Sequence, residues 1–207
     1  MLNQLVIVEE IYIKLNVTEI PSYAFNQNNL KVIEIATSNK IKLKKMAFYN
    51  LDDLEEITLY SDINKIEKEA FIFNKTSDKL IKINFERDRT SSMTLSGTEF
   101  ESGSFDGIKR PVKINFYNVN VLFLSKASFE SVLNQINNTI DFGYSSAIDC
   151  FDCRNQWLIR DQKDKQVSGD MCIHDNELRL FYNDTISDLN SKCNSSNPNK
   201  YVPCDYR

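Results

Sequence analysis

Histidine and glycine are scarce in this chain, whose 207 residues include one histidine, His174, and five glycines. A single histidine excludes metal sites and proton relays that are built from several histidines. The chain also has no glycine-rich phosphate loop and no Gly-x-Ser-x-Gly nucleophile elbow. We therefore expect a protein that is not an enzyme and that holds no cofactor or metal ion.

Long apolar runs are also missing. The longest, LVIV and VLFL, are far shorter than the roughly 20 residues of a membrane-spanning helix, so no transmembrane segment is expected. A net charge of -4 argues against nucleic acid as a partner. The apolar start of the chain is interrupted by Glu9 and Glu10, unlike a signal peptide, and we expect the chain to be a fragment that is truncated at its N-terminus.

One short motif is present again and again: a large apolar residue, three variable positions, Ala or Ser, then Phe. Its copies end at Phe25, Phe48, Phe71, Phe105 and Phe129, with intervals of 23, 23, 34 and 24 residues. A period in the twenties is typical of a solenoid, in which each repeat is one coil. The longer interval contains a polar, Ser/Thr-rich stretch, residues 86–99, which predicts a surface loop. Amphipathic helices are the alternative, but they do not account for five copies in near register.

Alternating apolar residues precede each motif, as in LKVIEI and LEEITL, and they indicate short, half-buried strands. Each coil is expected to add one strand to a parallel sheet and to return on the far side, where the Phe fills the core. In the copy LIKINF, Leu80 is expected to point inward with Ile83 and Phe85. Polar residues after the strands are expected to bond the turning backbone: Asn16, Ser38, Asp62, Asp88 and Ser145, with Asn118 or Asn120 substituting for Val119.

This pattern resembles the leucine-rich repeat in its longer extracellular form, over roughly residues 8–145. The resemblance implies an α/β solenoid with a short parallel sheet on the concave side and an irregular or helical convex side. We expect residues 1–146 to form about six coils.

The chain after residue 146 differs in composition from the repeats and contains all five cysteines. Cys150-x-x-Cys153, followed by Trp157-Leu158, Cys172 and Cys193, resembles the cysteine-rich C-terminal flank of extracellular leucine-rich-repeat proteins. The resemblance implies that residues 147–207 are a disulfide-bonded cap and tail.

Four cysteines allow three pairings, and spacing alone does not select one. The resemblance implies Cys150–Cys172 and Cys153–Cys193. A zinc site in which His174 could replace a cysteine stays open as an alternative. Cys204 is left over, either as a free thiol or as a link to another chain or to a missing tail.

The cap most resembles arthropod proteins that are similar to the non-catalytic subunit of shrimp luciferase. Together with the cysteines, five Asn-x-Ser/Thr sequons favour a secreted, extracellular glycoprotein. We expect Asn16 to be buried and its sequon to be empty. The expected glycosylation sites are Asn74, Asn137, Asn183 and Asn194.

What remains for function is a surface. Residues that alternate with the buried ones point outward from each strand, and tyrosine among them is a good interface anchor. We expect a secreted protein-binding or structural protein whose protein partner, of unknown identity, contacts the concave face. The alternatives are a non-catalytic stabilising subunit of a secreted enzyme complex and an intracellular solenoid adaptor. The predicted contact residues are Tyr12, Lys14, Glu34, Thr58, Tyr60, Asn84, Glu86, Asn115, Tyr117 and Asp141.

Overall fold

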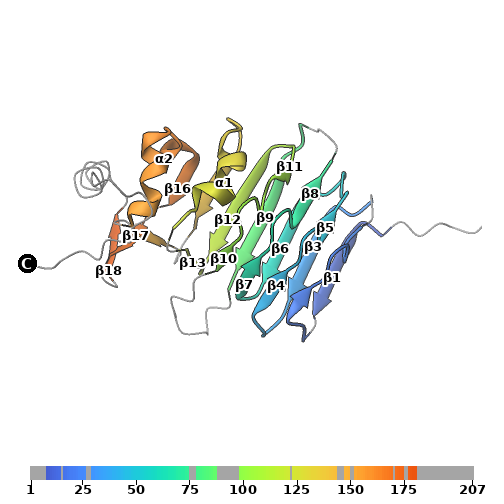
Figure 1. Cartoon of the computed structure of the whole chain (residues 1–207). Coiled ribbons are helices and arrows are strands. Elements are labelled where there is room, and N and C mark those ends of the chain that lie inside the picture. Colours follow the sequence, from blue (N-terminus) through green and yellow to red (C-terminus); the bar gives the residue numbers. More distant parts are fainter. Residues whose placement is uncertain are drawn as a thin grey trace, which may run out of the picture.

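A computed structural model gives the fold (Figure 1). It describes residues 8–14, 16–26, 29–74, 78–87, 98–121, 123–143, 147–149, 152–169, 171–174 and 177–180. In this part of the chain, no helix is long and apolar enough to cross a lipid bilayer.

The strands predicted from alternation form one long parallel sheet, in which each coil contributes one strand (Figure 1). Its register places like residues side by side, for example Ile33 beside Ile57 and Ile57 beside Ile83. These isoleucines are fully buried, so one face of the sheet covers the core. In sheet order the strands are β1 (Glu10–Lys14), β3 (Val32–Ala36), β6 (Glu56–Tyr60), β9 (Ile81–Glu86), β12 (Val112–Tyr117), β14 (Thr139–Phe142) and β16 (Val167–Gly169).

The far side of the first coils also consists of strands, where an irregular or helical convex side was expected. Two narrower parallel sheets run along the solenoid, because short alternating segments such as Ile41–Leu43 bury every second residue. The second sheet contains β10 (Glu99–Phe100), β7 (Ile63–Ile66), β4 (Ile41–Leu43) and β2 (Glu19–Ile20). The third contains β11 (Gly107–Ile108), β8 (Phe71–Phe73) and β5 (Phe48–Tyr49).

The recurrent phenylalanines form a stack inside the solenoid. The rings of Phe25, Phe48, Phe71 and Phe105 follow one another at centroid distances of 5.2, 5.1 and 5.5 Å, within 7° of parallel. The ring of Phe129 continues the row at 5.2 Å but is tilted by 36°. The prediction that these residues lie in one core is confirmed. The small residue before Phe is fully buried in four coils, which permits the close approach: Ala47, Ala70, Ser104 and Ser128.

The corners before four of these phenylalanines, all but Phe129, have left-handed backbone. Tyr23, Met46, Glu69 and Gly103 have φ values between 54° and 76°. The N–H of each donates to the carbonyl of the equivalent residue in the next coil, at 2.8–2.9 Å, and the last donates to Ala127. Three of the four are not glycine, so the hydrogen bonds between coils maintain a conformation that costs about 1–2 kcal/mol per residue.

Two details of the repeat differ from expectation. Leu80 is 44% exposed, because β9 begins one residue earlier than β3 and β6 and Ile81 takes the buried place. The residues that bond the turning backbone lie one position earlier than predicted. Ser61 Oγ donates to Asn39 O at 2.8 Å, whereas Ser38 is exposed. Asn118 does substitute for Val119, with Nδ2 donating to Arg87 O at 3.3 Å.

Asn16 is exposed and accepts a hydrogen bond from Asn39 Nδ2 at 2.7 Å. The expectation that Asn16 is buried was therefore wrong, because its side chain lies at the surface and bonds the side chain of Asn39 in the next coil. Asp88 and Ser145 lie outside the described residues, and of Asn120 only the backbone is described.

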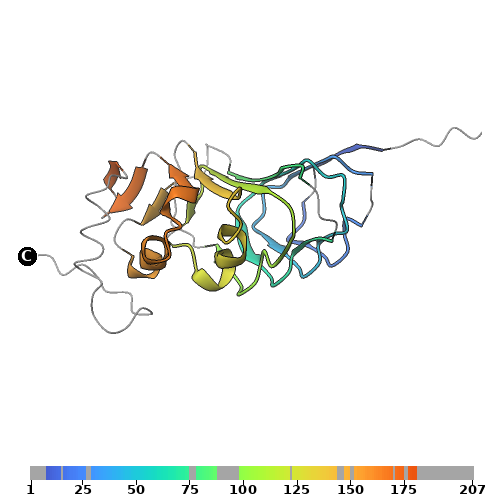
Figure 2. The same cartoon turned by 90° about the horizontal axis from the view of Figure 1, so that it is seen from above.

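Helices replace the outer strands toward the C-terminus (Figure 2). They are α1 (Lys126–Leu133), α2 (Gln156–Arg160) and two short 3-10 helices, Cys153–Asn155 and Asp164–Gln166. The remaining strands are β13 (Asn120–Val121), β15 (Ala147–Asp149), β17 (Met171–His174) and β18 (Glu177–Leu180).

The predicted Trp-Leu pair lies in the common core. Trp157 and Leu158 are each 4% exposed, and Trp157 Nε1 donates to Leu124 O at 2.7 Å. The C-terminal strands β15 and β16 pair in parallel with β13 and β14. The segment after residue 146 therefore continues the stacking of coils; the division into residues 1–146 and 147–207 stays a prediction.

Cys153 is buried and disulfide-bonded. The side chains of the other four cysteines, Cys150, Cys172, Cys193 and Cys204, lie outside the part of the structure that is described. The pairings Cys150–Cys172 and Cys153–Cys193 and the role of Cys204 therefore stay predictions.

Candidate functional site

The ten predicted contact residues lie on one face of the long sheet, opposite the core; we call it the outer face. Two rows cross its strands. The central row places Tyr12, Glu34, Thr58, Asn84, Asn115 and Asp141 side by side, and the second row contains Lys14, Tyr60, Glu86 and Tyr117. The structure thus brings together residues that are up to 129 positions apart in the chain (Tyr12 to Asp141).

Three members of the central row are buried by their neighbours on the same face. Thr58, Asn84 and Asn115 are 4%, 7% and 3% exposed. They form a polar ladder: Asn115 Nδ2 donates to Asn84 Oδ1 at 2.6 Å, and Asn84 Nδ2 donates to Glu56 Oε1 at 2.7 Å and Thr58 Oγ1 at 3.0 Å. Because they are buried, these three side chains connect neighbouring strands and present little surface to a partner. The burial of these three side chains depends on the register between strands, and that register could not be predicted from the sequence.

The ladder ends at an unsatisfied atom. Asn115 Oδ1 is buried and has no hydrogen-bond partner among the described residues. Its neighbour in the row is Asp141, whose carboxylate forms an ion pair with Lys113 Nζ at 2.9 Å. An ionised carboxylate has no proton to donate to an amide oxygen. The oxygen of Asn115 therefore lacks a donor at the point where the ladder stops.

Tyrosines lie in both rows. Tyr12 of the central row and Tyr60 of the second row are 67% and 37% exposed. The ring of Tyr117 lies against the backbone of the next strand, since a Cβ on Gly143 would be 2.5 Å from two of its ring carbons. A side chain at position 143 would collide with the Tyr117 ring, so glycine is needed there. Partly exposed tyrosines are good interface anchors.

Carboxylates surround Tyr60. Burial, followed by the charges of Glu34, Glu86 and Glu56, raises the pKa of the Tyr60 hydroxyl. No ion pair in the described part of the chain involves any of these three glutamates. Sequence reasoning missed Glu56 and Lys113, although both lie two residues before predicted contact residues on the same strands and so share their face.

The surface of the second sheet differs, because its acids are neutralised. Glu67 pairs with Lys42 at 2.7 Å, and Lys65 pairs with Glu99 at 2.7 Å and Glu101 at 2.8 Å. The hydrogen bond from Lys42 lowers the pKa of Glu67 to about 2, with further help from the Lys45 N–H. These pairs connect successive coils.

The ion pairs of Glu67 predict acid sensitivity. A carboxyl whose pKa is lower in the folded protein stabilises the fold above its ordinary pKa, near 4.5, and this contribution is lost as the pH falls toward about 2. We expect Glu67→Gln to reduce the free energy of unfolding at pH 7 by less than about 1 kcal/mol, because the pair is partly solvated. The difference between variant and wild type should shrink steadily from pH 5 to pH 2 in urea titrations. A difference that stays constant with pH, or one that Glu55→Gln reproduces, would contradict this assignment.

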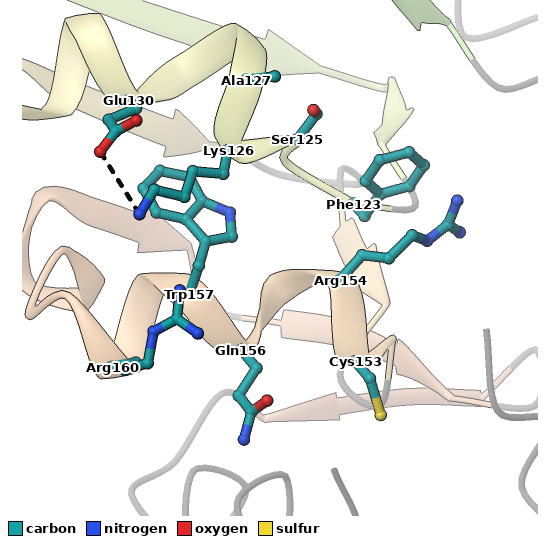
Figure 3. Close-up of a pocket in the computed structure, with 10 residues that line it drawn as sticks. All are labelled: Phe123, Ser125, Lys126, Ala127, Glu130, Cys153, Arg154, Gln156, Trp157 and Arg160. Atoms are coloured by element: carbon teal, nitrogen blue, oxygen red, sulfur yellow. Dashed lines mark ion pairs between the residues drawn. The ribbon is translucent and has the colours of Figure 1, made fainter. Parts of the chain in front are cut away.

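A pocket lies between α1 and the segment Cys153–Arg160, and it is the second candidate site (Figure 3). Its volume is about 460 Å³, and its lining includes both Lys126 of α1 and Trp157 of α2. Its cations are largely neutralised: Lys126 pairs with Asp161 at 2.7 Å and Glu130 at 3.4 Å, and Arg154 pairs with Asp152. The lining residues are Phe123, Ser125, Lys126, Ala127, Glu130, Cys153, Arg154, Gln156, Trp157 and Arg160.

In the described residues, no group of three or more His, Cys, Asp or Glu side chains is placed to hold a metal ion. Of the predicted glycosylation sites, Asn74 and Asn137 are exposed, whereas Asn183 and Asn194 lie outside the described residues.

Comparison with known proteins identifies the repeat. The family model of the BspA type leucine rich repeat region (6 copies) matches residues 3–94. The match supports the prediction of leucine-rich repeats in this part of the chain, and the parallel sheet continues beyond the matched residues through β12, β14 and β16. No curated protein matches the chain.

Proposed function

We propose that this leucine-rich-repeat protein is a secreted, non-enzymatic binding protein that recognises a protein partner on the outer face of its long sheet. The observation that carries the proposal is a combination of two features on one sheet face. Exposed tyrosines lie there beside carboxylates that form no ion pair within the described residues, and the hydrogen-bonded ladder connects the strands between them. Leucine-rich repeats commonly bind protein partners, and those of BspA type are often found on surfaces or in secretions.

Three further features support secretion. The cysteines cluster in one segment, Cys153 is disulfide-bonded, and the sequons at Asn74 and Asn137 are exposed. Disulfides persist in oxidising, extracellular compartments. The cap pairings Cys150–Cys172 and Cys153–Cys193 and glycosylation at Asn74, Asn137, Asn183 and Asn194 belong to this proposal.

Affinity capture tests the binding face. The immobilised protein, its double variant Tyr60→Ala/Tyr117→Ala and the control Tyr23→Ala are each exposed to native secretions of the source. Tyr23 is also an exposed tyrosine, 53% accessible, but lies at the corner near Tyr49 and not on the outer face. We expect the double variant to lose at least tenfold in affinity, about 1.4 kcal/mol, for the captured partner.

The control should capture the same partner as the wild type, and circular dichroism should show that both variants are folded. If the double variant retains every partner at wild-type affinity, the outer face is not the binding site. If Tyr23→Ala loses the partner instead, the site lies at that corner.

A further inference from the structure

The outer face has a charge arrangement that differs from the rest of the solenoid. On the second sheet Glu67, Glu99 and Glu101 each have a lysine partner within 3 Å. On the outer face Glu34, Glu56 and Glu86 surround Tyr60, and none forms an ion pair within the described residues. Two lysines of this face are exposed: Lys14 on the edge strand β1, and Lys82, which lies beside Glu56 in the register without an ion pair between the two. Carboxylates that lie close together around an aromatic ring repel one another, and a cation supplied by a binding partner would relieve that repulsion.

An independent observation points to a missing donor at the same face. Asn115 is 97% buried (3% exposed), and its Oδ1 has no hydrogen-bond partner in the described part of the chain. The ladder through Asn84 joins it to Glu56, so the unmet acceptor and the carboxylates belong to one connected network. A buried acceptor without a donor destabilises the folded protein. The destabilisation disappears if a ligand N–H reaches it.

We propose that the outer face binds a basic segment of its partner through two anchors. At the first, an arginine or lysine side chain lies over Tyr60 between Glu34 and Glu86. At the second, another basic side chain donates to Asn115 Oδ1 and to the Asp141 carboxylate. This inference rests on the proposed function, since it specifies the chemistry of the partner at the same face.

Each anchor has a physical basis. A guanidinium over a tyrosine ring gains a cation–π interaction, and two flanking carboxylates add charge-assisted hydrogen bonds. At the second anchor the ligand replaces Lys113, which now pairs with Asp141 and is 36% exposed, so its side chain is free to turn into solvent. Tyr60 lies on β6 and Asn115 on β12, two strands apart, which corresponds to about 10 Å at a strand spacing of about 4.8 Å. Asn115 also lies one row earlier, about 7 Å along the strands, so the two positions are about 12 Å apart. Three residues of an extended chain cover about 10 Å, and the length of an arginine side chain covers the rest.

Fluorescence polarisation with a defined peptide tests the proposal. The probe is fluorescein-labelled Gly-Arg-Gly-Gly-Arg-Gly, and the matched control replaces both arginines by citrulline, which has the same shape without the charge. At 50 mM salt we expect the arginine peptide to bind at least tenfold more tightly than the citrulline peptide. The double variant Glu34→Gln/Glu86→Gln should lose at least fivefold for the arginine peptide, whereas Glu99→Gln on the second sheet should bind as the wild type does.

The second anchor predicts a gain. Lys113→Met removes the resident cation of Asp141, so the arginine peptide should bind at least threefold more tightly, an effect that loss of folding does not produce. Equal binding of both peptides, or wild-type binding by Glu34→Gln/Glu86→Gln, would overturn the first anchor; unchanged or weaker binding by Lys113→Met would overturn the second.

The outcome is separable from that of the capture experiment. If the natural partner depends on Tyr60 and Tyr117 but is insensitive to 500 mM salt and to the glutamate variants, the binding face stands and the basic-segment inference fails. If the arginine peptide binds as expected but Tyr60→Ala/Tyr117→Ala keeps its natural partner, the cation site exists and the proposed function of the face is wrong.

Discussion

Replacing Phe71 by alanine is expected to lower the free energy of unfolding by about 4–5 kcal/mol. Phe71 is fully buried and stacks on Phe48 at 5.1 Å and on Phe105 at 5.5 Å. Deleting a buried Phe side chain costs about 3–5 kcal/mol, and two aromatic contacts are lost in addition. Urea unfolding followed by circular dichroism measures the loss as a shift of the midpoint.

The end of the stack provides the matched comparison. Phe25 is 8% exposed and, among the described residues, stacks on the single ring of Phe48, at 5.2 Å. Phe25→Ala should therefore cost clearly less, about 2–3 kcal/mol. Equal losses at both positions would mean that stacking between coils contributes little, and a loss below 2 kcal/mol at Phe71 would contradict the proposed core.

Arg110→Ala is expected to have an effect of similar size, about 3–5 kcal/mol. Arg110 is 1% exposed and holds two turns together, since Nε donates to Lys79 O at 3.1 Å and Nη1 donates to Asp52 O at 2.8 Å. Burial lowers the pKa of Arg110, and the nearby charge of Asp52 acts in the opposite direction. Hydrogen bonds from a charged donor contribute about 1.5–3 kcal/mol each, and alanine also leaves a cavity.

Two variants separate the causes of that loss. Arg110→Met keeps most of the volume, so the part of the loss that it retains reports the hydrogen bonds. Lys109→Ala, at the exposed neighbouring position, should change stability by less than about 0.5 kcal/mol. If Arg110→Met is as stable as the wild type, the bonds to Asp52 and Lys79 do not stabilise the fold.

The sequence predicted those parts of the fold that repeat. Phe at a period of 23 or 24 residues, preceded by alternating apolar residues, was sufficient to place five phenylalanines in one core and to align the long sheet. The same alternation put all ten predicted contact residues on one face. Periodic features can be predicted because the same residue pattern recurs in every coil.

Features that occur once, or that are very short, escaped prediction. Strands of two or three residues, such as Glu19–Ile20, are too short to show a period, so the second and third sheets were missed. Left-handed corners at Tyr23, Met46 and Glu69 lack the glycine that normally marks them. Arg110 gave no signal, because its burial depends on turns from two other coils.

The burial of Thr58, Asn84 and Asn115 illustrates a further limit. Alternation assigns these residues to the outer face, but only register across β6, β9 and β12 shows that they touch one another. An amide beside an amide forms a ladder, and an amide beside Asp141 does not. The unsatisfied oxygen of Asn115 arises from this change of residue type along a single row.

The longest coil shows how the solenoid accommodates extra length. Residues 88–97 fall between β9 and β10, yet β10 pairs with β7 in register, Glu99 beside Lys65 and Phe100 beside Ile66, and the Phe stack continues without a gap. The distance between successive rings is thus nearly the same across this 34-residue interval as across the 23-residue interval before it. We therefore expect that a reporter tag or a foreign epitope can be inserted between β9 and β10 while β10 still pairs in register with β7.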